Sequence, residues 1–413
     1  MRVEKSTVVY AIVVALLLIV GAWSQNDIFY RMIIALMVAI CLDRGKRQQC
    51  LVNPFYLFLL TPISLLIYCN ISDKYMENLT TGTWFIATIN ILSFVVGLDV
   101  ASKPEQHLTE EVSEEDIDFK QLIILFCCLG FIPRMLHLFL KISLPLYSVF
   151  SLLSALSLFC AIKSRKKVYI AIVVALNLCI WMVDVSKTEV LMNCLACLIA
   201  FESRKKEFDS SEKRKSIAFI IIAVCVMLAS FSFANQARGA KTAMSQLEYY
   251  SRYGGVKWSR NAMLFMPYMY LTTPWANLQY VMRTQPSKLF GMWTIKPIIS
   301  WLQLDGILQN QYQMVAKSSF NTFTFIACEF KDFGVVGSAI VTFCLGTFVG
   351  HIFRCTNNLK NTWQTMMYIY TALAVLEMFF SNHFFQVGYP FTIGILIMVC
   401  KIAIQRRVRR KLR

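Results

Sequence analysis

Apolar residues occur along this chain in runs of about the length that a membrane-spanning helix needs, roughly 20 residues. Short polar stretches separate the runs. The runs lie near residues 7–24, 28–42, 51–70, 83–100, 120–138, 145–162, 168–184, 190–201, 216–233, 334–353, 365–381 and 389–404. The pattern predicts an all-α polytopic integral membrane protein with about 12 transmembrane helices.

The composition agrees with this prediction. Of the 413 residues, 57% are hydrophobic and 16% are charged, whereas a soluble domain has about a quarter of its residues charged. The net charge of +17 would favour nucleic-acid binding in a soluble protein. In a membrane chain it first reflects topology, because cytoplasmic loops collect Lys and Arg. No nucleic-acid partner is therefore expected.

Basic residues occur in alternate loops. Lys and Arg are abundant in the loops at 43–50, 163–167 and 202–215 and in the tail after residue 404, all assigned inside. The short loops assigned outside carry only Lys74, Lys141 and Lys187. This asymmetry predicts that both termini are cytoplasmic.

One segment interrupts the pattern. Residues 234–333 are predicted to form a long loop on the outer face, between a nine-helix region (1–233) and a three-helix region (334–413) with a basic cytoplasmic tail. Two apolar stretches of the loop, 263–282 and 292–304, are expected to lie in the interface or re-enter the membrane, broken by their prolines. Irregular backbone at that depth must line a protein cavity. We expect an outward-facing cavity lined by basic and aromatic residues.

Such a cavity suits an anionic lipid that carries a glycan. Arginine binds phosphate with two parallel hydrogen bonds, and aromatic rings stack on sugars. The simpler alternative is that the basic residues bind phospholipid headgroups and the aromatic residues form an interfacial belt.

Ionisable residues also occur inside the predicted spans. Arg134 follows Pro133 and is either a functional group or a side chain that extends to the interface. Glu377 and His383, near the outer end of the span at 365–381, are candidates for proton transfer, or else Glu377 pairs with an arginine. Phosphate-loop and zinc-protease patterns are absent, and the chain has only 4 histidines. Neither a cofactor nor a metal is expected.

Three segments carry a family resemblance. YLTTPWANLQY (270–280), NTFTF (321–325) and DFGVVGSAIVTFCLG (332–346), in this order, resemble the Wzy-type repeat unit polymerases of O-antigen and capsule assembly. The resemblance implies a GT-C-like integral-membrane glycosyltransferase architecture in the bacterial cytoplasmic membrane. It implies a polymerase that transfers a glycan from undecaprenyl pyrophosphate to an incoming lipid-linked repeat unit, with a chain-length regulator as a possible partner.

The resemblance also directs attention to outer-loop residues, although the Arg-x10-Gly pattern of some family members does not occur here. The catalytic candidates are Arg238, Arg252, Arg260, Glu248, Glu377 and His383. The candidates for substrate binding are Arg283, Tyr270, Trp275, Asn277, Asn321, Thr324 and Arg134. Asp332 is expected to cap the helix that follows it, with Gly334 in a tight turn.

Two alternative functions remain open at this stage. An O-antigen ligase would use similar loop chemistry and a different acceptor. A flippase for lipid-linked oligosaccharides would have a similar number of spans, but transporters commonly show two related halves, and none are visible here.

Overall fold

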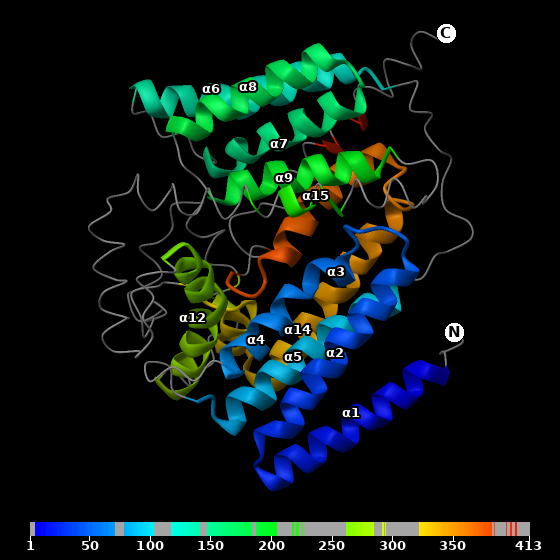
Figure 1. The fold of residues 1–413 in the computed structure, drawn as a ribbon, viewed down its shortest axis with the longest axis vertical. Coiled ribbons are helices and arrows are strands. Elements are labelled where there is room, and N and C mark those ends of the chain that lie inside the picture. The colour runs from blue at the N-terminus through cyan, green and yellow to red at the C-terminus, as the bar shows by residue number, and fades with distance from the viewer. Residues whose placement is uncertain are drawn as a thin grey trace.

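The computed structural model describes residues 5–70, 78–102, 117–140, 147–183, 187–204, 262–284 and 322–381, and isolated residues within 217–225, 291–294 and 384–402. Every regular element in this part of the chain is a helix (Figure 1). The helices are α1 (Lys5–Ser24), α2 (Asp27–Arg47), α3 (Pro54–Phe58), α4 (Leu60–Asn70), α5 (Thr81–Ala101), α6 (Phe119–Leu140), α7 (Tyr147–Lys163), α8 (Lys167–Val183), α9 (Lys187–Glu202), α12 (Ala262–Thr284), α14 (Phe325–Cys355) and α15 (Thr362–Leu376).

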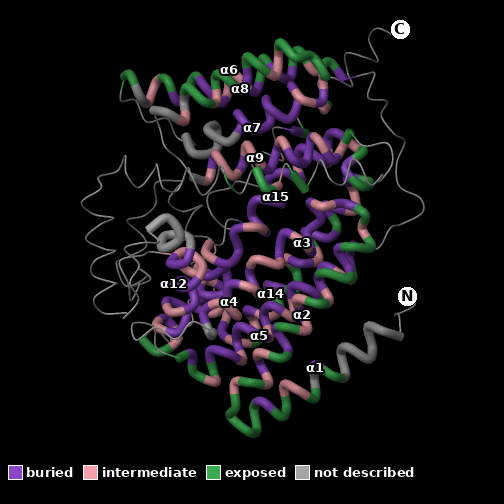
Figure 2. The backbone as a smooth tube through the Cα atoms, viewed as in Figure 1, coloured by how far each residue is buried: buried purple, intermediate pink, exposed green. Residues whose placement is uncertain are grey.

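The all-helical class is confirmed for the described residues. Among them, three helices are long and apolar enough to cross a membrane: Thr81–Ala101, Phe119–His137 and Phe325–Cys355. Shorter apolar helices accompany them at Pro54–Tyr68, Leu153–Lys163 and Lys167–Cys179. Apolar side chains such as Ile132, Phe139 and Ile172 are exposed on α6 and α8 (Figure 2). A surface of this kind is stable against lipid tails and costly in water.

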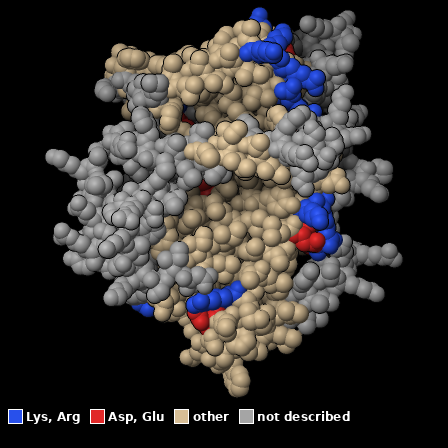
Figure 3. Space-filling model, viewed as in Figure 1, with Lys and Arg blue, Asp and Glu red and all other residues tan. Residues whose placement is uncertain are grey.

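The helix ends that carry basic residues lie toward one side of the molecule. The ends of α2, α7, α9 and α14 and the start of α8 lie toward the right in Figure 1. In sequence, these ends hold Arg44–Arg47, Lys163–Lys167, Arg204 and Arg354. On the face drawn in Figure 3, lysine and arginine side chains gather near that edge. Most of the remaining described surface on this face is uncharged.

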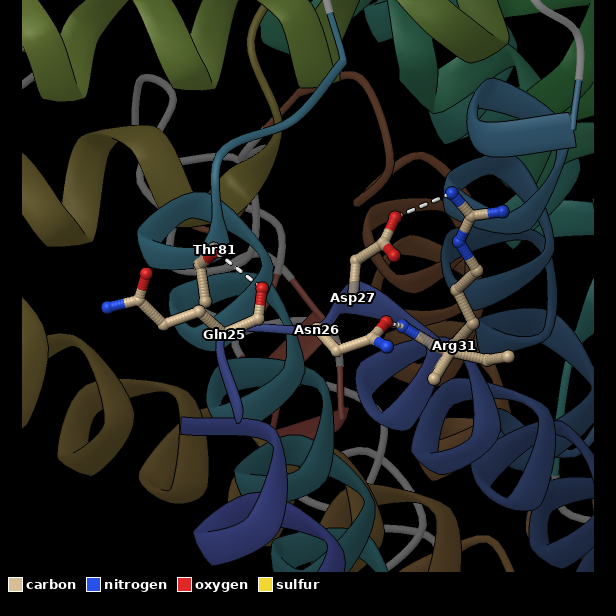
Figure 4. Close-up of polar contacts among 6 residues, drawn as sticks. Gln25, Asn26, Asp27, Arg31 and Thr81 are labelled. Carbon is tan, nitrogen blue, oxygen red and sulfur yellow. Dashed lines mark hydrogen bonds and ion pairs between the residues drawn. The ribbon is translucent and has the colours of Figure 1, made fainter. Parts of the chain in front are cut away.

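The corner between α1 and α2 lies at the bottom of Figure 1, and Figure 4 shows its polar contacts. Asn26 precedes α2, and its side chain accepts a hydrogen bond from the Ile28 N–H at 3.0 Å. This bond satisfies one of the free amides at the start of the helix. One turn later, Arg31 forms an ion pair with Asp27 at 2.6 Å. Both features are local in sequence and set where α2 begins.

Helices α5 and α14 pack closely through glycines. A Cβ on Gly97 would lie 2.3 Å from the carbonyl oxygen of Phe343, and a Cβ on Gly346 would lie 2.3 Å from that of Phe94. Any side chain at either position would clash with backbone. The G-x-x-x-G of Gly346 and Gly350 is therefore a packing surface within the chain.

Helix α14 bends sharply at Gly334, where φ is +69° and ψ is −164°. In one straight helix, residues 13 positions apart are separated by about 20 Å. Thr342 Oγ1 nevertheless lies 2.5 Å from Glu329 Oε2, 13 positions earlier. Residues 325–333 therefore fold back against the first turns of the long segment 335–355. Gly334 provides the left-handed turn that this hairpin needs.

Helix α12 corrects the prediction for residues 263–282. The expected breaks at Pro267 and Pro274 do not occur, because the helix runs continuously from Ala262 to Thr284. The hydroxyls of the two residues before Pro274 bond back to the helix, Thr272 to Tyr268 O at 2.8 Å and Thr273 to Met269 O at 2.6 Å. Proline therefore does not end a helix at this position.

Candidate functional site

The structure describes about half of the predicted site residues. Arg134, Tyr270, Trp275, Asn277, Arg283, Thr324 and Glu377 lie within it. Arg238, Glu248, Arg252, Arg260, Asn321 and His383 lie outside the described residues.

One face of α12 contacts the chain just before α14. Asn277 Nδ2 donates to the carbonyl oxygen of Thr322 at 2.8 Å, and the hydroxyls of Thr273 and Thr322 lie 3.3 Å apart. On the same face, the ring of Tyr270 meets the ring of Phe380 edge to face at 6.0 Å. This face of α12 therefore holds the 322–325 segment and the residues after α15 together.

Thr324 and Glu377 come from these two held segments. The Phe325 N–H donates to the carbonyl oxygen of Met378 at 3.0 Å. Thr324 directly precedes Phe325 and Glu377 directly precedes Met378, so this bond brings Thr324 and Glu377 near one another. Thr324 is 0% exposed and Glu377 2% exposed. The hydroxyl of Thr324 has no hydrogen-bond partner within the described part of the chain, although such a group normally has one when buried.

Trp275 and Arg283 lie apart from this cluster. The indole N–H of Trp275 donates to Ser64 Oγ on α4 at 2.9 Å, and the ring is fully buried. Trp275 thus packs into the protein core. Arg283 is exposed in the last turn of α12.

Arg134 belongs to a different region. Its guanidinium on α6 forms an ion pair with Glu189 on α9, and both side chains are at least nine-tenths buried. The proline of α6, Pro133, directly precedes it. Arg134 therefore has a charged partner inside the protein. The contact is with protein, and its role in binding substrate stays a prediction.

A buried polar cluster on α14 was not singled out from the sequence. Glu329, Lys331 and Asp332 are all at most 2% exposed. Glu329 contacts Thr342, Thr342 contacts Asn90 of α5 at 2.8 Å, and Asn90 contacts Ser338 at 3.2 Å. The signal was present in EFKD (329–332), three charged residues at the edge of an apolar run. An ionisable residue in such a place is a functional candidate by default.

Asp332 has a contact that the sequence did not indicate. We expected it to cap the helix after it. Its Oδ2 accepts hydrogen bonds from the Thr294 N–H at 2.7 Å and the Thr294 hydroxyl at 2.6 Å. Asp332 therefore ties the turn at Gly334 to a segment 38 residues earlier in the chain.

The arrangement supplies hydroxyl, amide and carboxyl groups in an otherwise apolar setting. Such groups can bind and orient sugar hydroxyls, and a carboxylate can accept a proton. Among the described residues, no group of three or more His, Cys, Asp or Glu is placed to hold a metal ion.

Comparisons with known proteins add no relative to this picture. No protein-family model matches the chain, and no curated protein and no solved structure matches it at a significant level.

Proposed function

We propose that this chain is a Wzy-type polymerase, a membrane glycosyltransferase that joins lipid-linked oligosaccharide repeat units. The observation that supports the proposal best is the meeting of the three segments on which the resemblance rests. Asn277 of the first segment bonds to Thr322 of the second. The second continues into α14, whose first part folds back on the third segment at Gly334. Segments that resemble one family in order along the chain therefore also meet in space.

The sidedness of the helices supports an outer-face site. The basic helix ends share one side, which the positive-inside rule assigns to the cytoplasm. The first part of α12 and the end of α15 lie on the other side in Figure 1. With about 12 spans and both termini inside, the site faces outward in the bacterial cytoplasmic membrane, where lipid-linked repeat units are polymerised.

The transfer step assigns a role to each group. A hydroxyl oxygen of the acceptor sugar attacks the anomeric carbon of the donor glycan, and the bond to pyrophosphate breaks with its electrons. The carboxylate of Glu377 is proposed to take the hydroxyl proton, because it is buried beside Thr324. Thr324 orients the acceptor with its hydroxyl. Arg238, Arg252 and Arg260 are proposed to stabilise the charge that develops on pyrophosphate.

The decisive experiment uses purified protein and an undecaprenyl-pyrophosphate-linked repeat unit. We expect glycan chains of several repeats from the native protein and single units with Glu377→Gln. A matched control is Glu202→Gln, a buried carboxyl at the end of α9 on the opposite side, which should keep activity. Absence of polymer with the native protein and a verified substrate would oppose the proposal.

A deletion strain separates the alternatives. Loss of a polymerase leaves lipopolysaccharide capped by one repeat unit. Loss of a ligase leaves none, and loss of a flippase retains the lipid-linked unit on the cytoplasmic face.

A further inference from the structure

The motif DFGVVG at 332–337 lies at the turn of α14, and the proposed transfer step assigns no role to it. Gly334 has φ +69° and ψ −164°, a backbone conformation that is open essentially to glycine alone. Asp332, which is fully buried, and Phe333 directly precede this turn. Both of them contact a segment far away in the sequence.

Asp332 makes a polar contact with the segment 291–294. Met292 and Thr294 are helical and follow the turn residue Gly291. An amide in the first turn of a helix has no partner within that helix. The Thr294 N–H donates to Asp332 Oδ2 at 2.7 Å, and the Thr294 hydroxyl donates to the same oxygen at 2.6 Å. One carboxyl oxygen therefore accepts both hydrogen bonds from Thr294.

Phe333 makes an apolar contact with the same segment. A Cβ on Gly291 would lie 3.4 Å from Cζ of the Phe333 ring, and Gly291 has a φ of +90°, which favours glycine. Within the motif, a Cβ on Gly337 would lie 2.4 Å from Cβ of Phe333. A side chain at position 337 would therefore displace Phe333. The glycines at 291 and 337 leave the space that Phe333 occupies.

The helical residues 325–333 connect this contact to the candidate site. Thr324 directly precedes them, and the helical rise from Phe325 to Asp332 is about 10 Å. The contact between Asp332 and Thr294 spans 38 positions of the sequence. It therefore sets where the segment 291–294 lies relative to Thr324 and Glu377.

We infer that Asp332 and Phe333 form a docking point for the segment 291–294, and that Asp332 is a positioning residue for the candidate site. Asp332 acts through Thr294, and Gly334 and Gly337 give the motif the shape that this contact requires. The docking point fixes the place at which the chain between α12 and α14 returns to the helices. The positioning role rests on the proposed function, whereas the docking contact does not.

The test is hydrogen–deuterium exchange of the full chain in lipid nanodiscs, read by mass spectrometry on the peptide that contains Thr294. Asp332→Ala removes the acceptor of two hydrogen bonds, so exchange of this peptide should become about tenfold faster. The matched control is Asp43→Ala, which removes a carboxyl group from an exposed ion pair with Arg47 and should leave exchange at Thr294 at the native rate. Equal exchange at Thr294 in the native protein and in Asp332→Ala would overturn the inference.

A second pair of variants leaves α14 intact and covers the case in which Asp332→Ala misfolds. Thr294→Val removes the hydroxyl donor and should make exchange about threefold faster, whereas Thr294→Ser keeps both donors and should match the native protein. The peptide covering 325–333 should exchange at the native rate in both variants. Equal exchange of the Thr294 peptide in the valine and serine variants would contradict the docking contact.

The activity measurement uses the undecaprenyl-pyrophosphate-linked repeat unit. Asp332→Asn keeps an acceptor oxygen and should retain most polymer formation, whereas Asp332→Ala should lower kcat about tenfold. The loss in Thr294→Val should lie between them, in the same order as the exchange rates. Equal inactivation by Asp332→Asn and Asp332→Ala would overturn the positioning role, because it would mean that the carboxylate itself reacts with substrate. Absence of polymer from the native protein would oppose the proposed function and leave the exchange test of the docking contact in force.

Discussion

Two regions of this protein bury a carboxyl group in an apolar surrounding, and the polar partner that it contacts differs between them. Between α6 and α9, Glu189 faces the guanidinium of Arg134. Between α14 and α5, Glu329 faces the hydroxyl of Thr342. The first arrangement keeps both charges and compensates each with the other. In the second, Glu329 contacts Thr342, which in turn contacts Asn90 of α5. The two carboxyl groups therefore differ in what a substitution leaves behind, which is a buried guanidinium in the first region and a buried hydroxyl in the second.

The largest predicted difference comes from the same substitution in both regions. Glu189→Gln leaves the buried Arg134 without its opposing charge, which should lower the free energy of unfolding by roughly 3–5 kcal/mol. Glu329→Gln keeps an amide that can hydrogen-bond with Thr342 at the same position and should change the free energy of unfolding by less than about 1 kcal/mol. Denaturant unfolding of both variants in the same detergent, followed by helical circular dichroism, measures the difference.

The double variant Arg134→Met/Glu189→Leu serves as the control for the ion pair. It removes both charges and fills the space, and should recover most of the lost stability. Similar losses in the free energy of unfolding for Glu189→Gln and Glu329→Gln would contradict the predicted difference between the two carboxyl groups.

A smaller effect is expected where α5 and α14 meet. Gly97→Ala places a Cβ 2.3 Å from Phe343 O and should cost about 1–3 kcal/mol by overpacking. The separation of the two helices would also strain the contact between Asn90 and Thr342. Gly82→Ala is the matched control in the same helix, because a Cβ at that position would have no neighbouring atom within 4 Å. Thermal unfolding midpoints of the two variants should diverge, and equal midpoints would refute the close contact.

The loss of a buried hydrogen bond between two uncharged groups should have the next smaller effect on stability. Ser64→Ala removes the acceptor of the Trp275 indole N–H, leaving a buried donor unsatisfied at a cost of about 1–2 kcal/mol. Ser24→Ala is a suitable control, since Ser24 bonds only within its own helix at an exposed position. The denaturation midpoint should fall in the first variant and stay in place in the second. Equal midpoints in the two variants would place Trp275 outside the core.

The smallest effect is predicted for an exposed ion pair. Asp27→Asn breaks the ion pair with Arg31. The side chain of Arg31 is 36% exposed and that of Asp27 is 41% exposed. Exposed pairs of this kind contribute about 0.2–0.5 kcal/mol. The pair between Arg134 and Glu189 has the same chemistry in a buried place. A large loss in Asp27→Asn, measured by the same denaturation, would show that burial does not explain the difference between them.

The helices were largely predictable from the sequence. Apolar runs from 7–24 to 190–201 coincide with α1 to α9, because the length of an apolar run directly reflects the element that it can form. The predicted breaks at Pro267 and Pro274 were wrong, because α12 continues through both prolines.

The site was predicted in part. Asn277 and Thr324 were named from the resemblance, and the structure places both around the 322–325 segment. Trp275 was named with them, but it lies on another face of α12 and bonds to Ser64. One turn of a helix brings adjacent residues to different faces, so a motif identifies a segment and does not say which of its side chains share a site.

The sequence by itself determined which segments are apolar helices and which helix ends are basic, because hydrophobicity and charge add up locally along the chain. Only the tertiary structure decided that Glu329 faces Thr342 and Asn90, and that Arg134 faces Glu189. Asn90 and Thr342 are 252 positions apart, and no local property relates them. Their meeting depends on the close approach at Gly97 and Gly346 and on the turn at Gly334, and this geometry sets which buried polar groups contact one another.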